Sequence, residues 1–259
     1  MLNEKKELSA MARVEEATQL LMRLIAGDDP EIVRQETQEF LAVIEPQDIA
    51  LAEQKLLELG IGVSDFRRLC AAHAEAFKDQ KSKIITTLPQ GHVLNRVLSE
   101  HEMIICFVSE LEDINKEIQQ PDYSAQDTAQ IKKLAHVARY FVLADERHQR
   151  QDEIMLPELE KRCYYGPSQI IKMGHISVNS SKHELKNLVE HDTHRDFSQF
   201  KWKLNAIVGV LAPTTREFIF IEDNILYPVA LEVIDDPSVW ERVKAISDEM
   251  GYCGLCMDW

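Results

Sequence analysis

The sequence is poor in the residues that break helices. Glycine and proline each occur only nine times in 259 residues, and so few turn-forming residues favour long helices over a turn-rich sheet. No apolar run approaches the roughly 20 residues that span a bilayer. The N-terminal segment MLNEKKELSAMARVEE is charged and lacks the apolar stretch of a secretory signal. These absences predict a soluble, helical, cytoplasmic protein.

Basic residues are also scarce. The chain has 29 Lys and Arg against 44 Asp and Glu, which gives a formal net charge of −15. Binding to a phosphate backbone needs clustered Lys and Arg, and docking on an anionic lipid surface needs them too. We therefore expect neither nucleic acid nor a membrane among the partners, and we interpret the acidic surface as one that keeps the protein soluble.

Cysteines are few and odd in number: Cys70, Cys106, Cys163, Cys253 and Cys256. Such a set without a signal segment predicts a reducing compartment and free thiols. The C-x-x-C spacing of Cys253 and Cys256 is also that of redox and zinc sites, and Cys70 with His73 could complete a four-ligand zinc site. We favour free thiols for the pair.

Helical periodicity divides the chain into a part with short helices and a part with long ones. Asp29-Pro30 and Asp236-Pro237 each combine an N-cap with a first-turn proline. We predict short helices at residues 8–26, 30–44 and 46–60, and one that starts at Ser64. After a linker at residues 81–90, we predict long helices at residues 92–118, 125–162, 168–190 and 197–233, then a last helix at 237–250. Pro157 should kink or end the second long helix, and Pro213 should interrupt the fourth.

A weak internal repeat lies on the second and fourth long helices. Residues 154–160 read IMLPELE, residues 225–232 read ILYPVALE, and both follow an acidic cluster. Four long helices with short connections predict an antiparallel bundle, and the repeat predicts that its two halves are related by pseudo-symmetry.

The repeat resembles the hemerythrin-like cation-binding family. In that family each half of the bundle carries one lone His on one helix. The other helix of each half carries His, then Glu four residues on, then Pro six residues after the Glu. Further matches are Gly91-His92, residues 98–101 (LSEH), Gly166-Pro167, residues 171–175 (IKMGH) and residues 246–253 (ISDEMGYC). Residues 27–31 (GDDPE) and 69–73 (LCAAH) resemble the helical domain of unknown function that often precedes this bundle.

The resemblance implies a domain organisation. We expect an all-α protein with a small N-terminal helical domain at residues 1–80, an up-down four-helix bundle at 91–234 and a C-terminal helical extension at 235–259. It also implies that two His-Glu pairs and two lone His side chains converge on metal in the bundle core, because residues four apart share one helix face.

The sequence keeps three of the six ligands that the resemblance implies. These are His101, His175 and Glu222. His148 and Asp152, also four apart, and His92 are further candidates. One residue along a helix is a rotation of about 100°, so His148 and Asp152 reach the same point only after a local change of register.

Three positions depart from the pattern. Arg147 and Phe218 stand where the resemblance implies His, and Gln151 stands where it implies Glu. A guanidinium is a permanent cation that competes with a metal. We therefore hypothesise that Arg147 occupies the vacated centre and pairs with Glu222, with Phe218 as an apolar plug.

Two readings of function follow. The resemblance implies non-haem iron chemistry, so one reading is a protein that binds mononuclear or dinuclear iron, or zinc, and senses or handles O2, NO, redox state or iron. The alternative is a metal-free regulatory or interaction module, with Arg147 and Phe218 filling the former centre and with a second copy or an unidentified protein as partner. An oxidoreductase ranks below both, because the ligands for O2 activation are incomplete.

Overall fold

The computed structural model describes residues 9–62, 80–123, 128–191 and 196–252, and within these ranges every regular element is a helix. The all-α prediction is therefore confirmed. The helix predicted from Ser64, with Cys70 and His73, lies outside the described residues, and so do Cys253 and Cys256. The described chain divides into two compact units. We call residues 1–87, 158–170 and 220–235 the first unit, and residues 88–157, 171–219 and 236–259 the second unit.

The helices of the first unit begin where the sequence supplies caps. Asp29 accepts a hydrogen bond from the Glu31 N–H with Pro30 in the first turn, and Glu45 and Asp48 form a capping box. Two predicted features come out differently, because residues 30–44 form two short helices and the predicted linker contains a helix. The helices of the N-terminal part are α1 (Ala10–Ala26), α2 (Pro30–Glu36), α3 (Gln38–Leu41), α4 (Pro46–Glu58) and α7 (Gln80–Thr87).

Helix α4 joins the N-terminal part to the two later segments of the first unit. It packs on α1, on the π-helical turn η3 (Glu222–Leu226) and on α14 (Tyr227–Val233). The Gln54 side chain accepts hydrogen bonds from the N–H groups of Tyr165 (3.1 Å) and Gly166 (3.2 Å). A Cβ on Gly166 would lie 2.7 Å from the Gln54 Cβ, so this approach requires glycine. The domain boundaries predicted from the resemblance stay a prediction.

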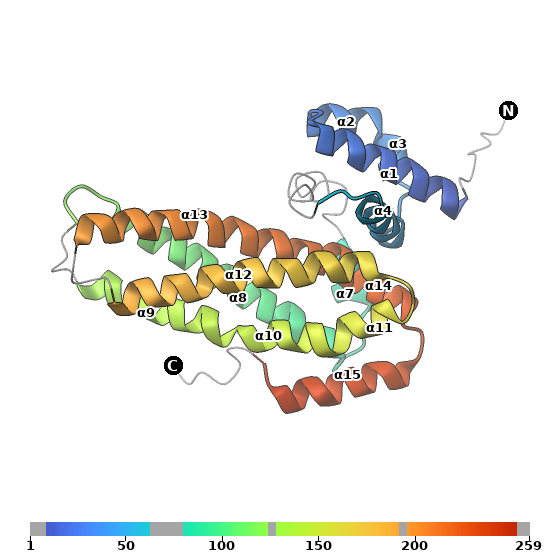
Figure 1. Cartoon of the computed structure of the whole chain (residues 1–259). Coiled ribbons are helices and arrows are strands. Elements are labelled where there is room, and N and C mark those ends of the chain that lie inside the picture. Colours follow the sequence, from blue (N-terminus) through green and yellow to red (C-terminus); the bar gives the residue numbers. More distant parts are fainter. Residues whose placement is uncertain (1–8, 63–79, 124–127, 192–195, 253–259) are drawn as a thin grey trace. The chain divides into compact units, whose positions relative to one another are not determined.

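The second unit holds the long helices, which Figure 1 shows running side by side. Asn115 on α8 donates to Asn205 on α13 (3.0 Å), and Arg216 on α13 makes a bidentate pair with Glu112 on α8. Helix α8 also packs on α9. The elements are α8 (Val93–Ile118), α9 (Thr128–Leu143), α10 (Asp145–Arg150), the π-helical turn η2 (Gln151–Met155), α11 (Leu156–Glu160), α12 (Tyr165–His191), α13 (Phe197–Ile221) and α15 (Pro237–Met250). Helix α11 runs into the first unit, and α12 begins there.

The interruption predicted at Pro213 is wrong. Helix α13 continues through this proline to Ile221. Pro213 is exposed, so water can satisfy the Gly209 carbonyl that loses its helical partner.

Both segments of the internal repeat contain a π-helical turn that the sequence analysis missed. The Leu156 N–H donates to the Gln151 carbonyl, and the Tyr227 N–H donates to the Glu222 carbonyl, each five residues back. The next residue is proline in both cases, Pro157 and Pro228. Proline has no N–H and its ring crowds the carbonyl four residues earlier. A widened turn relieves this crowding, and the chain stays helical through the proline. The sequence did carry a sign of these turns, because a proline recurs at the same place in both apolar repeat segments.

One described helical run, Phe197–Val233, is long and apolar enough to cross a membrane by length and composition. Of its most apolar window, 56% is buried within the protein. A core helix of a soluble protein gives this result, so the finding is consistent with solubility.

Candidate functional site

The centre of the second unit is built around a buried arginine. Arg147 on α10 is 4% exposed. Its Nη1 lies 2.9 Å from Nε2 of His101 on α8, and its Nη2 lies 2.9 Å from Nε2 of the adjacent His148. His101 is fully buried and His148 is 3% exposed. One guanidinium therefore joins two of the histidines predicted as metal ligands.

These contacts fix the tautomers of both histidines. A guanidinium only donates hydrogen bonds, so Nε2 of His101 and Nε2 of His148 must both accept. The proton of the His148 ring then lies on Nδ1, which donates to Oδ1 of Asn179 on α12 (2.9 Å). Asn179 also lies 3.5 Å from Nζ of Lys182, a 2% exposed lysine that pairs with Asp145 at 3.0 Å. The centre thus extends as a polar network from α8 through α10 to α12.

His175 on α12 completes the cluster. Its ring stacks on that of His148 with centroids 4.0 Å apart. Its Nδ1 lies 3.0 Å from the Asp152 carboxylate, and its Nε2 lies 3.0 Å from the Gln151 side-chain amide. Both ring nitrogens of His175 therefore have partners in the protein.

A change of helical register lies within this cluster. The turn η2 begins at Gln151, between His148 and Asp152. A π-helical turn holds one more residue than an α-helical turn, so it rotates the faces of the residues that follow. His148, before this turn, and Asp152, inside it, both reach His175, one by ring stacking and the other by a hydrogen bond.

This arrangement does not fit a metal ion. A metal would need the Nε2 lone pairs of His101 and His148, and Arg147 takes both. Within the described ranges, no three His, Cys, Asp or Glu side chains are grouped so that they could hold a metal. A permanent guanidinium charge at this point would also repel a divalent cation.

Phe218 packs against Gly174, the residue before His175 in the sequence. A Cβ built on Gly174 would lie 2.3 to 2.5 Å from three atoms of the Phe218 ring, so the ring lies directly against the α12 backbone. Phe218 is 6% exposed. Gly174 thus makes room for the Phe218 ring, and the role of this ring as a plug of the former centre stays a prediction.

Two predicted ligands remain, His92 and Glu222. His92 is the N-cap of α8, where its Nδ1 accepts from the Leu94 N–H at 3.2 Å. Its ring lies 4.7 Å from that of Trp240, and burial lowers its pKa. Glu222 is fully buried at the start of η3 and belongs to the first unit. Its predicted pairing with Arg147 stays a prediction.

Two ion pairs of this region were missed from the sequence. Arg150 (4% exposed) forms a buried ion pair with Glu100, which is fully buried. Lys182 and its partner Asp145 were missed as well. The spacing could have revealed the first pair, since Arg150 lies one turn after Arg147 and Glu100 directly precedes His101.

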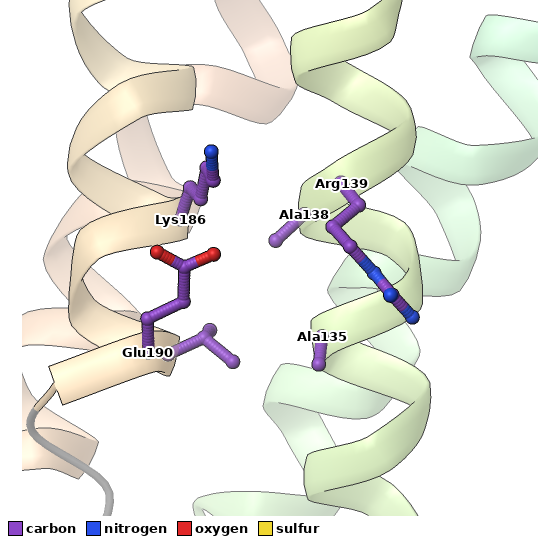
Figure 2. Close-up of a pocket in the computed structure, with 6 residues that line it drawn as sticks. Ala135, Ala138, Arg139, Lys186 and Glu190 are labelled. Atoms are coloured by element: carbon purple, nitrogen blue, oxygen red, sulfur yellow. The ribbon is translucent and has the colours of Figure 1, made fainter.

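A shallow groove lies on the surface between α9 and α12 (Figure 2). Its volume is about 260 Å³. It is lined by Ala135, Ala138 and Arg139 of α9 and by Lys186, Val189 and Glu190 of α12. The small alanine side chains leave this gap between the two helices.

The comparisons with known proteins bear on the N-terminal part. Residues 18–83 match the model of a family that is described as a family of unknown function (DUF438). This match supports the predicted N-terminal domain of unknown function. No curated protein matches the sequence. The resemblance of residues 91–234 to the hemerythrin-like family therefore stays a prediction.

Proposed function

We propose that the protein is a metal-independent regulatory or interaction module built on a hemerythrin-like, up-down four-helix bundle. The observation that carries the proposal is the Arg147 guanidinium, which takes the Nε2 lone pairs of His101 and His148. A side chain of the protein supplies the central positive charge that a metal supplies in the family it resembles. Phe218, packed on Gly174, supports the same reading, because it replaces a ligand with an apolar ring.

The fold part of the proposal is supported by pairwise contacts. Helix α8 contacts α9, α10 and α13, while α12 contacts α10 and α13. Such a closed cycle of neighbours is what an up-down bundle of four helices requires. The acidic composition further supports a soluble cytoplasmic protein whose partner is a protein rather than nucleic acid or membrane.

Elemental analysis of the untagged protein tests the proposal. The protein is purified without oxygen from iron-supplemented cells and compared with the triple variant R147H/Q151E/F218H, which restores the implied ligand set. We expect no stoichiometric metal in the natural protein and bound iron in the variant. One or more metals per natural chain would overturn the proposal.

Metal binding is a second candidate function, because the sequence resembles a metal-binding family and His148 and Asp152 both contact His175, although these described side chains form no ligand group as they stand. If the Arg147 side chain moved out, these groups and His101 could bind iron or zinc, and a role in sensing or handling O2, NO, redox state or iron would follow. One metal per chain, with a spectrum that changes in Arg147→Lys, would favour this second candidate.

A further inference from the structure

The C-terminal helix α15 is fastened to the second unit by a set of cationic contacts. It packs on α8, α10 and η2, with Val239, Val243 and Ser247 buried. Beyond its end, Arg150 donates through Nη1 to the Gly251 carbonyl. The same guanidinium donates through Nη2 to the buried Glu100. One arginine thus binds the C-terminal segment and α8 together.

Tyr252 strengthens this fastening. Two guanidinium groups lie over its ring, with the Cζ of Arg150 at 4.7 Å and the Cζ of Arg96 at 4.9 Å from the ring centroid. Its hydroxyl donates to Asp248 at 2.9 Å, and Arg96 lies 3.5 Å from the same carboxylate. Burial and the Asp248 carboxylate raise the pKa of Tyr252 to about 12, so its hydroxyl stays a donor at neutral pH.

The contacts that hold α15 and the contacts of the Arg147 centre involve the same two helices, α8 and α10. Glu100 and His101 are neighbours on α8, while Arg147 and Arg150 are one turn apart on α10. The Arg147–His101 contact and the Arg150–Glu100 pair are therefore adjacent bridges between the same two helices. A movement of α10 that breaks one bridge displaces the other, because both arginines are on one rigid helical turn.

We propose that α15 with Gly251 and Tyr252 is a latch, and that its docking is coupled to the Arg147 centre. In the docked state, Arg147 holds α10 against α8 and positions Arg150 for Glu100 and Gly251. When the Arg147 contacts are lost, Arg150 loses its alignment with Glu100 and Gly251, and α15 is released. This inference deepens the proposed function, because it identifies the moving element of the module.

Hydrogen exchange with mass spectrometry tests the coupling on the full chain. We expect Arg147→Met to raise exchange in peptides of α15 at least about tenfold, which corresponds to about 1.4 kcal/mol of local opening. The matched control is Arg216→Met, which also removes an arginine that contacts α8, in this case through Glu112. The control should leave α15 unchanged. Unchanged exchange of α15 in a folded Arg147→Met protein would refute the coupling.

A second variant keeps the test decisive if Arg147→Met does not fold. Tyr252→Ala removes the contacts of the Tyr252 ring with Arg96 and Arg150 and leaves the Arg147 contacts in place. Since coupling between two sites is reciprocal, exchange around residues 145–155 should rise with that of α15. A rise confined to α15 would refute the coupling. Metal content measured on the same samples tests the proposed function separately, so the two proposals can fail independently.

Discussion

Glu53 makes the stability of the first unit depend on pH. It is 1% exposed on α4, and burial raises its pKa from 4.5 to about 8. The folded protein therefore holds a proton on Glu53 at neutral pH, and the unfolded chain does not. Between pH 4.5 and 8 the folded state binds more protons, so stability falls as pH rises through this window.

The size of the effect follows from the two pKa values. Relative to a pH below both values, the free energy of unfolding is lower by about 1 kcal/mol at pH 5 and by about 3 kcal/mol at pH 7. In Glu53→Gln the side chain is neutral at every pH and nearly the same size. We therefore expect the variant to be more stable than the natural protein, with an advantage that grows by about 2 kcal/mol between pH 5 and pH 7.

Urea denaturation of both proteins at several pH values, followed by circular dichroism, measures this difference. Glu39→Gln is the control, because Glu39 is an exposed carboxylate in the same unit. Its free energy of unfolding should differ from that of the natural protein by the same amount at every pH. If the Glu53→Gln difference were also constant with pH, the buried protonated carboxyl would be refuted.

Three further predictions concern backbone positions. Gly174→Ala should destabilise by about 1–3 kcal/mol, because the new methyl group meets the Phe218 ring. Gly209→Ala, where the space is open, should instead stabilise by about 1 kcal/mol. A stabilising Gly174→Ala in thermal denaturation would disprove the close packing. Cys163 has a left-handed backbone with φ of 68° at the end of α11. Cys163→Gly should therefore stabilise by about 1 kcal/mol in urea denaturation, and a loss would contradict the assigned strain. Pro213→Ala should stabilise by up to about 3 kcal/mol by restoring a helical hydrogen bond, and unchanged stability in the same assay would argue against this lost bond.

The helix starts could be predicted because they depend on local chemistry. Asp29 and Asp236 each accept a hydrogen bond from an N–H in the first turn, and a proline follows each. A capping side chain and a proline restrict the backbone within a few residues, so no distant contact is needed to place them. The same reasoning could not place α7, because its position depends on contacts with η3 and α14, far along the sequence.

The proline positions show where local rules were insufficient. Pro213 was expected to interrupt a helix, and Pro157 to kink or end one. The first lies in continuous α-helix and the second follows a π-helical turn. The difference is in the surroundings, because Pro213 faces water while the residues before Pro157 are mostly buried. A buried helix keeps its packing by widening a turn, and sequence alone does not reveal which response occurs.

The identity of the site residues could be predicted, but their directions could not. Sequence spacing singled out Arg147, His148 and Asp152 without deciding which of them faces the centre. The structure turns Arg147 toward His101 and, within η2, turns Asp152 toward His175. Neighbouring helix residues differ in direction by about 100°. Which of them faces the centre depends on a π-helical turn that periodicity does not predict.

A guanidinium and a metal ion differ in how each holds the helices of a bundle together. A metal binds after or during folding, at a rate that depends on its supply, and it leaves when a chelator competes. Arg147 is part of the chain, so its bonds to His101 and His148 form whenever α8 and α10 come together. The natural protein should then keep its thermal midpoint in excess EDTA, while the iron-loaded triple variant R147H/Q151E/F218H should lose stability. A chelator-induced fall in the midpoint of the natural protein would mean that a metal, rather than Arg147, holds the helices together.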